Sequence, residues 1–236
     1  MAKKQDVMIA VDGLQKTFTL HLRDGLVLPV LHDLSFEVRR GECLVLAGPS
    51  GIGKSSLLRC IYGNYLPQAG AIKVRDNGGL CDLSGAAPGR VLALRRTTMG
   101  YVSQFLRVVP RVATLDLVME PLLDLGHDAG LVREKAATLL KRLRIPEQLW
   151  SVPPATFSGG EQQRVNIARS FIVGYPILLL DEPTAALDAE NQQTVVDLID
   201  EARESGAAII GIFHDEEVRE AVGTQELDLS RHKAAA

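Results

Sequence analysis

The stretch "CLVLAGPSGIGKSS" limits the fold of this chain more than any other part of the sequence. Mostly apolar residues at 43–47 lead directly into a glycine-rich turn, and Lys54 then opens a segment with helical apolar spacing. A continuous apolar run suits a strand that is covered on both faces. A strand followed at once by a helix predicts an α/β fold with parallel strands.

The same alternation continues along the chain. Short runs with strand character recur as "VMIAV", "LSFEV", "CLVLAG", "AIKV", "MGYVSQ", "ILLLD" and "AAIIGIF". Helical spacing separates several of them, over 54–62, 133–143, 161–173 and 189–204. The region from about 105 to 160 offers no strong strand and is typical of helices. We therefore expect one domain over 1–236, with a helical subdomain at about 105–160 inserted in a largely parallel α/β core.

Composition disfavours several classes of protein. A formal net charge of −3 gives no general attraction to nucleic acid or to an anionic membrane. The cysteines Cys43, Cys60 and Cys81 lack metal-ligand spacing and suit a reducing compartment. Apolar runs fall far short of the roughly 18 residues that a membrane span needs, and no secretion signal is evident. We expect a cytoplasmic protein that reaches a membrane only through a partner.

The glycine-rich turn has the chemistry of a phosphate site. It matches G-x-x-x-x-G-K-[ST], in which glycines such as Gly48, Gly51 and Gly53 let backbone N–H groups face a polyphosphate. Lys54 would neutralise the β- and γ-phosphates, and Ser55 would offer its hydroxyl to Mg²⁺. The alternative is a turn that binds nothing. The other residues of the predicted loop are Pro49, Ser50, Ile52 and Ser56.

Two carboxylates end the apolar run "ILLLDE". Ligands of doubly wound sheets lie at the carboxyl ends of the strands, so Asp181 and Glu182 are expected beside the phosphate loop. Asp181 suits the shell of Mg²⁺, and Glu182 suits the orientation or deprotonation of an attacking water. An acidic pair that only caps a helix is the alternative.

Two more polar residues end predicted strands. Gln104 closes "MGYVSQ", where its amide could reach the metal or the water, which makes Ser55, Gln104 and Asp181 the candidate metal set. His214 closes "AAIIGIFH", where it could contact the γ-phosphate. A histidine in this position is otherwise a structural residue.

A second glycine pair stands where a helix begins. In "TFSGGEQQR", Ser158 and Glu161 form the S-x-x-E pattern of a capping box, yet Gly159 and Gly160 each cost roughly 1 kcal/mol relative to alanine in a helix. Either the glycines allow close packing against a neighbouring element, or an anion approaches the exposed N–H groups.

Taken together, these motifs resemble the ATP-binding cassette family over essentially the whole chain. The order matches the family: the loop "GPSGIGKS", Gln104, "FSGGEQ", "ILLLDE", "AALD" ending in Asp188, and His214. The resemblance implies a P-loop NTPase core with an antiparallel β portion at the N-terminus, which hydrolyses ATP with Mg²⁺. It also implies that Phe18 stacks on adenine. Glu161 and Ile52 depart from the commonest residues at their positions.

The family pairs two chains head to tail, and this implies a role for the glycine pair. Ser158, Gly159, Gly160 and Glu161 would then face the γ-phosphate held by the partner chain, where alanine methyl groups would obstruct it. The partner would be a second copy or another cassette protein. Asp188, in the segment after the acidic pair, belongs to the same composite interface.

Longer stretches of the sequence indicate the cellular system in which the ATPase acts. "VSQFLRVVPR", "FSGGEQQRVNIARSFIV" and "YPILLLDEPTAALDA" resemble an ATPase component of the phosphonate C–P lyase system, which implies soluble assembly subunits as partners. The system joins methylphosphonate to the ribose triphosphate of ATP. The alternative is the ATPase subunit of a lipoprotein-release or macrolide-export transporter, which shares much of the core. In either case the apolar and arginine-rich segment 105–111 is a candidate docking surface.

Overall fold

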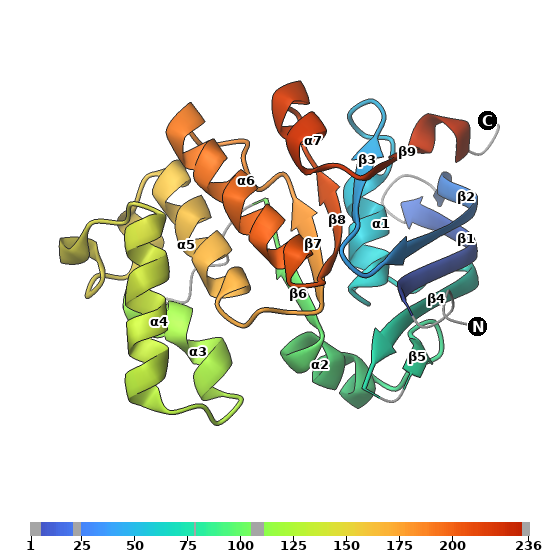
Figure 1. Cartoon of the computed structure of the whole chain (residues 1–236). Coiled ribbons are helices and arrows are strands. Elements are labelled where there is room, and N and C mark those ends of the chain that lie inside the picture. The colour runs from blue at the N-terminus through green and yellow to red at the C-terminus, as the bar shows by residue number, and fades with distance from the viewer. Residues whose placement is uncertain (1–5, 21–24, 78, 105–110, 233–236) are drawn as a thin grey trace.

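Two sheets and a set of helices make up the computed structural model, which describes residues 6–20, 25–77, 79–104 and 111–232 (Figure 1). One sheet is antiparallel, in the order β2-β1-β4-β5, and the other is parallel, in the order β6-β7-β8-β3-β9. The expected α/β fold, with a parallel sheet and an antiparallel N-terminal portion, is confirmed.

The strands are β1 (Val7–Leu20), β2 (Leu26–Arg39), β3 (Cys43–Ala47), β4 (Ala69–Asp76), β5 (Gly79–Asp82), β6 (Met99–Val102), β7 (Ile177–Asp181), β8 (Ala208–Ile212) and β9 (Gln225–Asp228). The α-helices are α1 (Lys54–Ile61), α2 (Pro88–Thr97), α3 (Thr114–Leu123), α4 (Ala129–Arg142), α5 (Gly159–Phe171), α6 (Ala189–Glu204) and α7 (Glu216–Val222). Short 3-10 turns are η2 (Glu147–Leu149), η3 (Pro154–Thr156) and η4 (Leu229–His232). Among the described residues, no helix has the length and apolar character that a membrane crossing requires.

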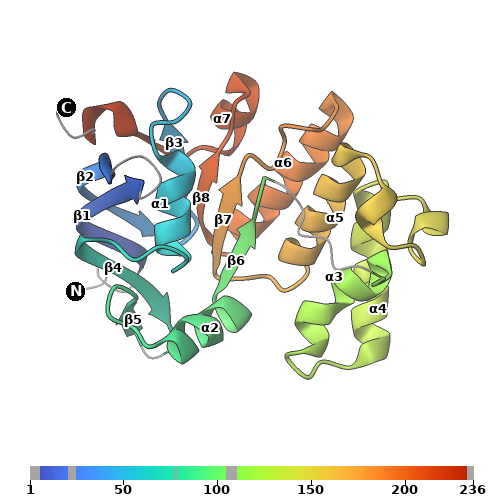
Figure 2. The same cartoon turned by 180° about the vertical axis from the view of Figure 1, so that it is seen from behind.

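The parallel sheet is covered on both faces, which explains its continuously apolar strands. Along β7, Ile177 and Leu179 face the core that α1 shares with the antiparallel sheet. Leu178 and Leu180 face the opposite core, which α5 and α6 close. Figure 2 shows α1 standing between the two sheets, so the loop that precedes α1 is fixed from both sides.

The long β1–β2 pair extends well beyond the short runs that the sequence predicts. Register shifts interrupt the pairing between Val11 and Leu14 and again near Lys16, and these shifts break the apolar alternation. Gly13 and Asp33 adopt left-handed backbone conformations with φ of 57° and 48°. An irregular strand of this kind hides its true length from periodicity alone.

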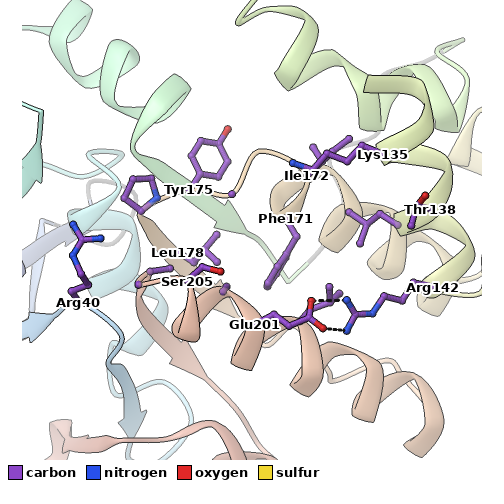
Figure 3. A pocket seen from close by; sticks show the side chains of 17 residues that line it. Arg40, Lys135, Thr138, Arg142, Phe171, Ile172, Tyr175, Leu178, Glu201 and Ser205 are labelled. Atoms are coloured by element: carbon purple, nitrogen blue, oxygen red, sulfur yellow. Dashed lines mark hydrogen bonds and ion pairs between the residues drawn. The ribbon is translucent and has the colours of Figure 1, made fainter. Parts of the chain in front are cut away.

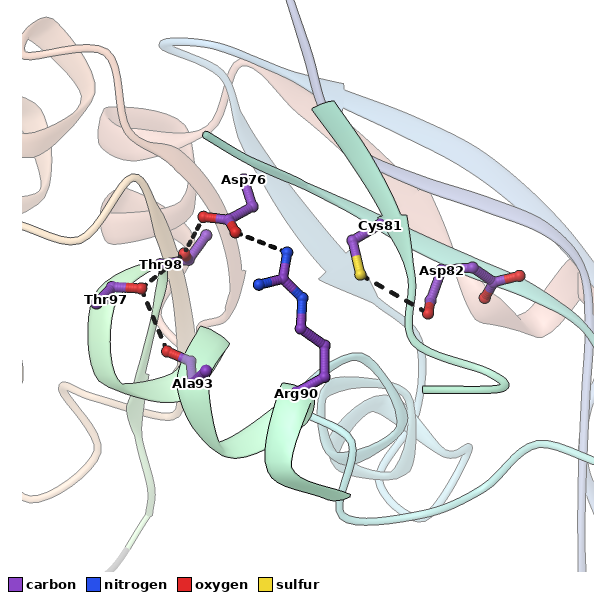
Figure 4. Close-up of polar contacts among 7 residues, drawn as sticks. All are labelled: Asp76, Cys81, Asp82, Arg90, Ala93, Thr97 and Thr98. Carbon is purple, nitrogen blue, oxygen red and sulfur yellow. Dashed lines mark hydrogen bonds and ion pairs between the residues drawn. The ribbon is translucent and has the colours of Figure 1, made fainter. Parts of the chain in front are cut away.

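Helix α2 is anchored by polar contacts rather than by a broad apolar face, because Leu94 is its one buried residue among those described. Arg90 donates to Asp76 Oδ2 at 2.8 Å, and Thr98 donates to Asp76 Oδ1 at 3.1 Å (Figure 4). Burial alone would raise the pKa of Asp76, but hydrogen bonds from the Asn77 backbone, Thr98 and Arg90 outweigh it and lower the pKa. These contacts tie the end of β4 to the start of β6.

The region predicted as a helical subdomain contains α3, α4, η2 and η3 among its described residues, and α5 begins at Gly159. Helices α3, α4 and α5 pack together at the end of the molecule remote from the antiparallel sheet (Figure 1). Residues 105–110, which carry most of the proposed docking surface, lie outside the described residues. The subdomain boundaries therefore stay a prediction.

Candidate functional site

The glycine-rich loop connects β3 to α1 in a conformation that its glycines make possible. Gly48, Gly51 and Gly53 all have positive φ, at 122°, 78° and 114°. A Cβ on Gly53 would lie 2.5 Å from the Val30 side chain, whereas Gly51 has open space. Among the described residues, apart from Gly51 and its chain neighbours, no atom lies within 4 Å of the position that a Cβ on Gly51 would take.

Backbone carbonyl groups of this loop hold the Lys54 side chain in place. Its Nζ donates to the carbonyl oxygens of Gly48 at 2.6 Å and Pro49 at 3.2 Å. The ammonium group therefore lies inside the turn, where a polyphosphate would compete for it. Ser50 is exposed, and Ser56 is half-buried in the first turn of α1.

Ile52 has a structural reason to be apolar. Its side chain packs against the core beneath the antiparallel sheet, and its backbone N–H donates to the Pro49 carbonyl at 3.3 Å. The Ile52 N–H of the predicted phosphate loop is thus bonded within the loop in this structure. A ligand would have to replace that contact.

Asp181 ends β7 with its side chain almost fully enclosed, at 3% exposure. Ser55 Oγ donates to Asp181 Oδ1 at 2.8 Å, and the Tyr101 hydroxyl donates to Oδ2 at 2.9 Å. A hydroxyl and a carboxylate in contact are the oxygen donors that Mg²⁺ uses, so these residues fit the ion. The described residues include no cluster of three His, Cys, Asp or Glu that could hold a metal unaided. Phosphate and water oxygens would have to complete the shell.

Glu182 follows β7, and its carboxylate contacts side chains that follow the ends of β6 and β8. Gln104 Nε2, after β6, donates to Glu182 Oε2 at 2.8 Å. His214 Nε2, after β8, lies 2.7 Å from Glu182 Oε1. The structure thus brings together all three predicted catalytic residues. It places the Gln104 amide on Glu182, and no contact of Gln104 with Ser55 or Asp181 supports its place in the metal set.

The backbone of Glu182 is in the left-handed region, with φ of 55°. A non-glycine residue held there costs roughly 1–3 kcal/mol, and such residues gather at functional sites. Its backbone N–H donates to the Ile212 carbonyl at 3.2 Å, which fixes the turn against β8. With this backbone conformation, the side chains of Glu182 and Asp181 point toward different partners, which agrees with the separate roles predicted for them.

Ser158 and Glu161 form the predicted capping box. Glu161 N donates to Ser158 Oγ at 3.3 Å, and Ser158 N donates to Glu161 Oε2 at 2.9 Å. Hydrogen bonds from the Ser158 side chain and backbone lower the pKa of Glu161. The capping box is confirmed, and it gives Glu161 a structural role within its own chain.

The two glycines of α5 differ in a way that the sequence could not show. A Cβ on Gly159 would meet nothing within 4 Å, but a Cβ on Gly160 would lie 2.8 Å from the Ala186 carbonyl oxygen. Gly160 is therefore required by packing within its own chain, which is the alternative that the sequence left open. Only Gly159 has the free space that close approach of a ligand would use.

Asp188 and Phe18 have local contacts of their own. Asp188 caps α6, because its Oδ1 accepts from Asn191 N at 2.9 Å and from Asn191 Nδ2 at 2.8 Å. Phe18 is half-buried, meets Tyr65 edge to face at 5.2 Å, and has Lys16 Nζ 4.8 Å from its ring centroid. Their roles toward the partner chain and adenine stay predictions.

Three further residues at the site escaped sequence reasoning. Tyr101 lies within the predicted strand "MGYVSQ", and burial together with the charge of Asp181 raises its pKa, so its hydroxyl keeps the proton that it donates. Asn166 Nδ2 donates to the Ser103 carbonyl at 2.7 Å, and Gln163 Nε2 donates to the Pro183 carbonyl at 3.3 Å. Both amides are buried on α5. Polar residues on the inner face of a helix were the signal that could have revealed them.

Comparison with known proteins agrees with this geometry. A sequence profile described as ABC transporter matches residues 31–185. The chain belongs to the ATP-binding cassette family. Membership of this family supports ATP hydrolysis as the activity, and the family generally binds ATP with Mg²⁺.

Several cassette proteins are similar over most of this chain. The arginine transport ATP-binding protein ArtP of Haemophilus influenzae is 36% identical over 86% of this chain and 83% of its own length. The lipoprotein-releasing system ATP-binding protein LolD of Maricaulis maris is 36% identical over 90% of each chain. The macrolide export ATP-binding/permease protein MacB of Brucella melitensis is 34% identical over 90% of this chain, which corresponds to 32% of that protein.

A solved cassette shares the fold. The dimeric post-hydrolysis state of the ATP-binding cassette MJ0796, bound to ADP and Pi, superposes with a TM-score of 0.84. The superposition covers 94% of each chain at 27% sequence identity. A second solved structure of the same cassette is also dimeric.

A cavity of about 550 Å³ lies away from the cassette site, between α4, α5 and α6 (Figure 3). Its lining is mainly apolar and includes Phe171, Tyr175 and Leu178, with the Arg142–Glu201 ion pair at one side. It opens where β7 and β8 begin, whereas Glu182 and His214 follow the ends of those strands. Gln104, Glu182 and His214 are not among the described residues that line the cavity.

Proposed function

We propose that this chain is the ATPase subunit of a transporter related to the lipoprotein-release and macrolide-export systems. The observation that carries the ATPase role is the convergence of Gln104 and His214 on Glu182, at the edge of the sheet where Ser55 contacts Asp181. A cassette that only bound nucleotide would not need a carboxylate held by two donors there.

The residues divide the work of hydrolysis by their positions. Lys54 and the loop N–H groups would bind the phosphates, and Ser55 and Asp181 would hold Mg²⁺, which neutralises charge on the phosphates when bound. Glu182 would orient a water and accept its proton. In this structure each Glu182 oxygen has one partner, Gln104 on Oε2 and His214 on Oε1, and each oxygen keeps a second lone pair that could accept from the water.

We propose that the site is completed by a second chain. The start of α5 presents Ser158 and the unobstructed Gly159, and a helix N-terminus favours an anion. Dimeric cassettes similar to this chain support a head-to-tail pair. ATP hydrolysis per chain should then rise with protein concentration, because a single chain holds an incomplete site.

A polar cleft of about 230 Å³ offers a place for a partner. It lies between the α2–β6 connection and helices α3 and α5, and it is lined by arginine, acidic and tyrosine side chains, among them Arg96, Tyr101, Glu120, Asp124 and Arg169. An ion pair from Arg169 to Glu120 and a hydrogen bond from Arg96 to the backbone carbonyl of Asp124 cross it, both at 2.6 Å. Tyr101 lines this cleft and also donates a hydrogen bond to Asp181. Only the Tyr101 side chain would therefore separate a partner bound in the cleft from Asp181.

The phosphonate hypothesis is a second candidate, carried by the stretches "VSQFLRVVPR" and "YPILLLDEPTAALDA". The relatives reported above are named for transport and export, and they support the transporter proposal better. The two proposals agree on the ATPase site and differ only in the partner.

One experiment separates the two partners. The gene is deleted in the source organism and restored with the wild type or with Glu182→Gln, and growth is measured with methylphosphonate or phosphate as the sole phosphorus source. In parallel, detergent-solubilised membranes and the soluble fraction are purified through an affinity tag on the chain. Normal growth on methylphosphonate with recovery of a membrane permease supports the transporter. Loss of growth on methylphosphonate alone, with soluble partners recovered, overturns it in favour of the phosphonate assembly.

A further inference from the structure

The cavity between α4, α5 and α6 has the size and the lining of a small-molecule site. Its volume of about 550 Å³ lies within the roughly 300–1,000 Å³ that ligand pockets occupy. Phe171 lines it from the end of α5, Tyr175 from the connection that follows, and Leu178 from β7 (Figure 3). Leu139 and Leu198 line it from α4 and α6. Large apolar side chains from separate elements therefore surround one space.

Helix α4 turns one side toward this cavity. Four of its residues line the cavity at the i, i+3, i+4 and i+7 spacing of a single helix face, namely Lys135, Thr138, Leu139 and Arg142. Arg142 donates two hydrogen bonds to the Glu201 carboxylate of α6, both at 2.6 Å. This pair crosses from α4 to α6 and neutralises both of its members.

The remaining charges around the cavity are positive. Its charged lining residues are Arg40, Lys135, Arg142 and Glu201. Within the part of the chain that the structure describes, neither Arg40 nor Lys135 takes part in an ion pair. Figure 3 places these two side chains on different sides of the cavity. A bound anion therefore has a cation available on either side, whereas a bound cation would meet only a carboxylate that Arg142 already holds.

The helix ends beside the cavity have partners of their own. Carbonyl groups at the C-terminus of a helix attract positive charge, and both α5 and α6 end here. The Phe171 carbonyl accepts from Gly174 N at 3.2 Å, and the Arg203 carbonyl accepts from Gly206 N at 2.9 Å. These carbonyl groups are already hydrogen-bonded within the main chain, so both cations stay available to a ligand.

We propose that this cavity binds a small amphipathic carboxylate. The apolar body of the ligand would pack against Phe171, Leu178 and their neighbours, because contact with them removes apolar surface from water. The carboxylate would lie at the rim, where Lys135 or Arg40 would donate to it. The inference does not depend on the proposed function, since it concerns residues outside the predicted ATP site.

The experiment uses three probes that share one alkyl chain and differ in the head group: octanoate, 1-octanol and octylammonium. Calorimetric titration of the full-length chain measures each Kd below the concentration at which the probe forms micelles. Lys135→Glu and Arg40→Glu reverse the two rim charges. Arg133→Glu is the matched control, because it changes the net charge equally and lies on the same helix but does not line the cavity. Ala202→Phe and Thr138→Trp fill the cavity, and thermal unfolding checks the fold of every variant.

Octanoate should bind the wild type and raise its Tm, because a ligand that binds only the folded chain stabilises it. Octylammonium should bind at least about tenfold more weakly, and Lys135→Glu or Arg40→Glu should weaken octanoate by about tenfold, the usual effect of one hydrogen bond to a charged group. Arg133→Glu should keep the wild-type Kd. Both filled variants should weaken octanoate and 1-octanol alike.

Three results would overturn the inference. The first is the absence of octanoate binding to the wild type. The second is equal binding of octanoate and octylammonium, or rim reversals that act no more strongly than Arg133→Glu, since either would exclude an anionic ligand. The third is octanoate binding that survives in both folded variants with a filled cavity, which would place the ligand elsewhere.

Discussion

Gly159 and Gly160 stand side by side at the start of α5, and the structure predicts opposite effects for the same substitution. In Gly160→Ala the new Cβ would lie 2.8 Å from the Ala186 carbonyl oxygen, which is closer than real Cβ atoms approach. That oxygen belongs to the main chain and cannot rotate away as a flexible side chain could. In Gly159→Ala the new Cβ would meet nothing within 4 Å.

The expected magnitudes follow from these contacts. Alanine gains up to about 1 kcal/mol over glycine within a helix, and this gain applies to both positions. Overpacking costs roughly 1–3 kcal/mol, and this loss applies only to Gly160→Ala. Gly159→Ala should therefore leave the free energy of unfolding unchanged or raise it slightly. Gly160→Ala should be less stable than Gly159→Ala by about 1–3 kcal/mol.

Urea unfolding of the nucleotide-free chain, followed by circular dichroism, measures this difference without any contribution from dimer formation. The wild type and both variants are compared at one protein concentration. The assay of ATP hydrolysis is then applied to Gly159→Ala, which should hydrolyse ATP more slowly if its open position faces a nucleotide held by the partner chain. Equal stability of the two variants, or greater stability of Gly160→Ala, would refute the packing argument.

Three further predictions test other parts of the structure. Glu182→Gln should still bind nucleotide but hydrolyse ATP about 10²–10⁴-fold more slowly, and a phosphate-release assay at the wild-type rate would remove Glu182 from the role of base. Glu161→Ala removes the hydrogen bonds that its carboxylate accepts from Ser158 and should lose about 0.5–1.5 kcal/mol of stability at pH 7. Because the pKa of Glu161 is lowered on folding, that difference should persist above the unfolded pKa of about 4.3 and vanish as the pH falls through the folded pKa, as unfolding curves at several pH values can show. Burial raises the pKa of Cys43 to about 12 and of Cys60 to about 11, so iodoacetamide at pH 8 should label Cys81 first, and mass spectrometry showing equal labelling of all three would contradict the described burial.

The sequence by itself determined the parallel sheet and the edge of it that carries the chemistry. Runs such as "ILLL" at 177–180 are apolar at every residue because both faces of the sheet are covered, and this signal is local. The carboxyl ends of parallel strands meet at one edge, so Gln104, Glu182 and His214 could be expected near one another before any coordinates were known. The capping box at Ser158 was equally local, because its two members are three residues apart.

The sequence did not predict the elements with weak apolar signals, because most of their residues are exposed. Strand β9 reads "QELD", and helix α2 buries only Leu94 among its described residues. Their placement depends on neighbours, since β9 pairs with β3 and α2 is tied to Asp76 through Arg90. Periodicity records how much of an element is buried, so an element that is mostly exposed leaves little trace in the sequence.

Only the tertiary structure decided which groups touch. The bond from Tyr101 to Asp181 spans 80 positions of the chain, and its existence depends on the register between β6 and β7. The left-handed backbone of Glu182 and the contact of Gly160 with Ala186 likewise follow from how β7, β8 and α5 are packed. Sequence patterns report the preferences of residues that are close along the chain. Contacts between distant residues are set by the summed packing of the whole core, which no single segment encodes.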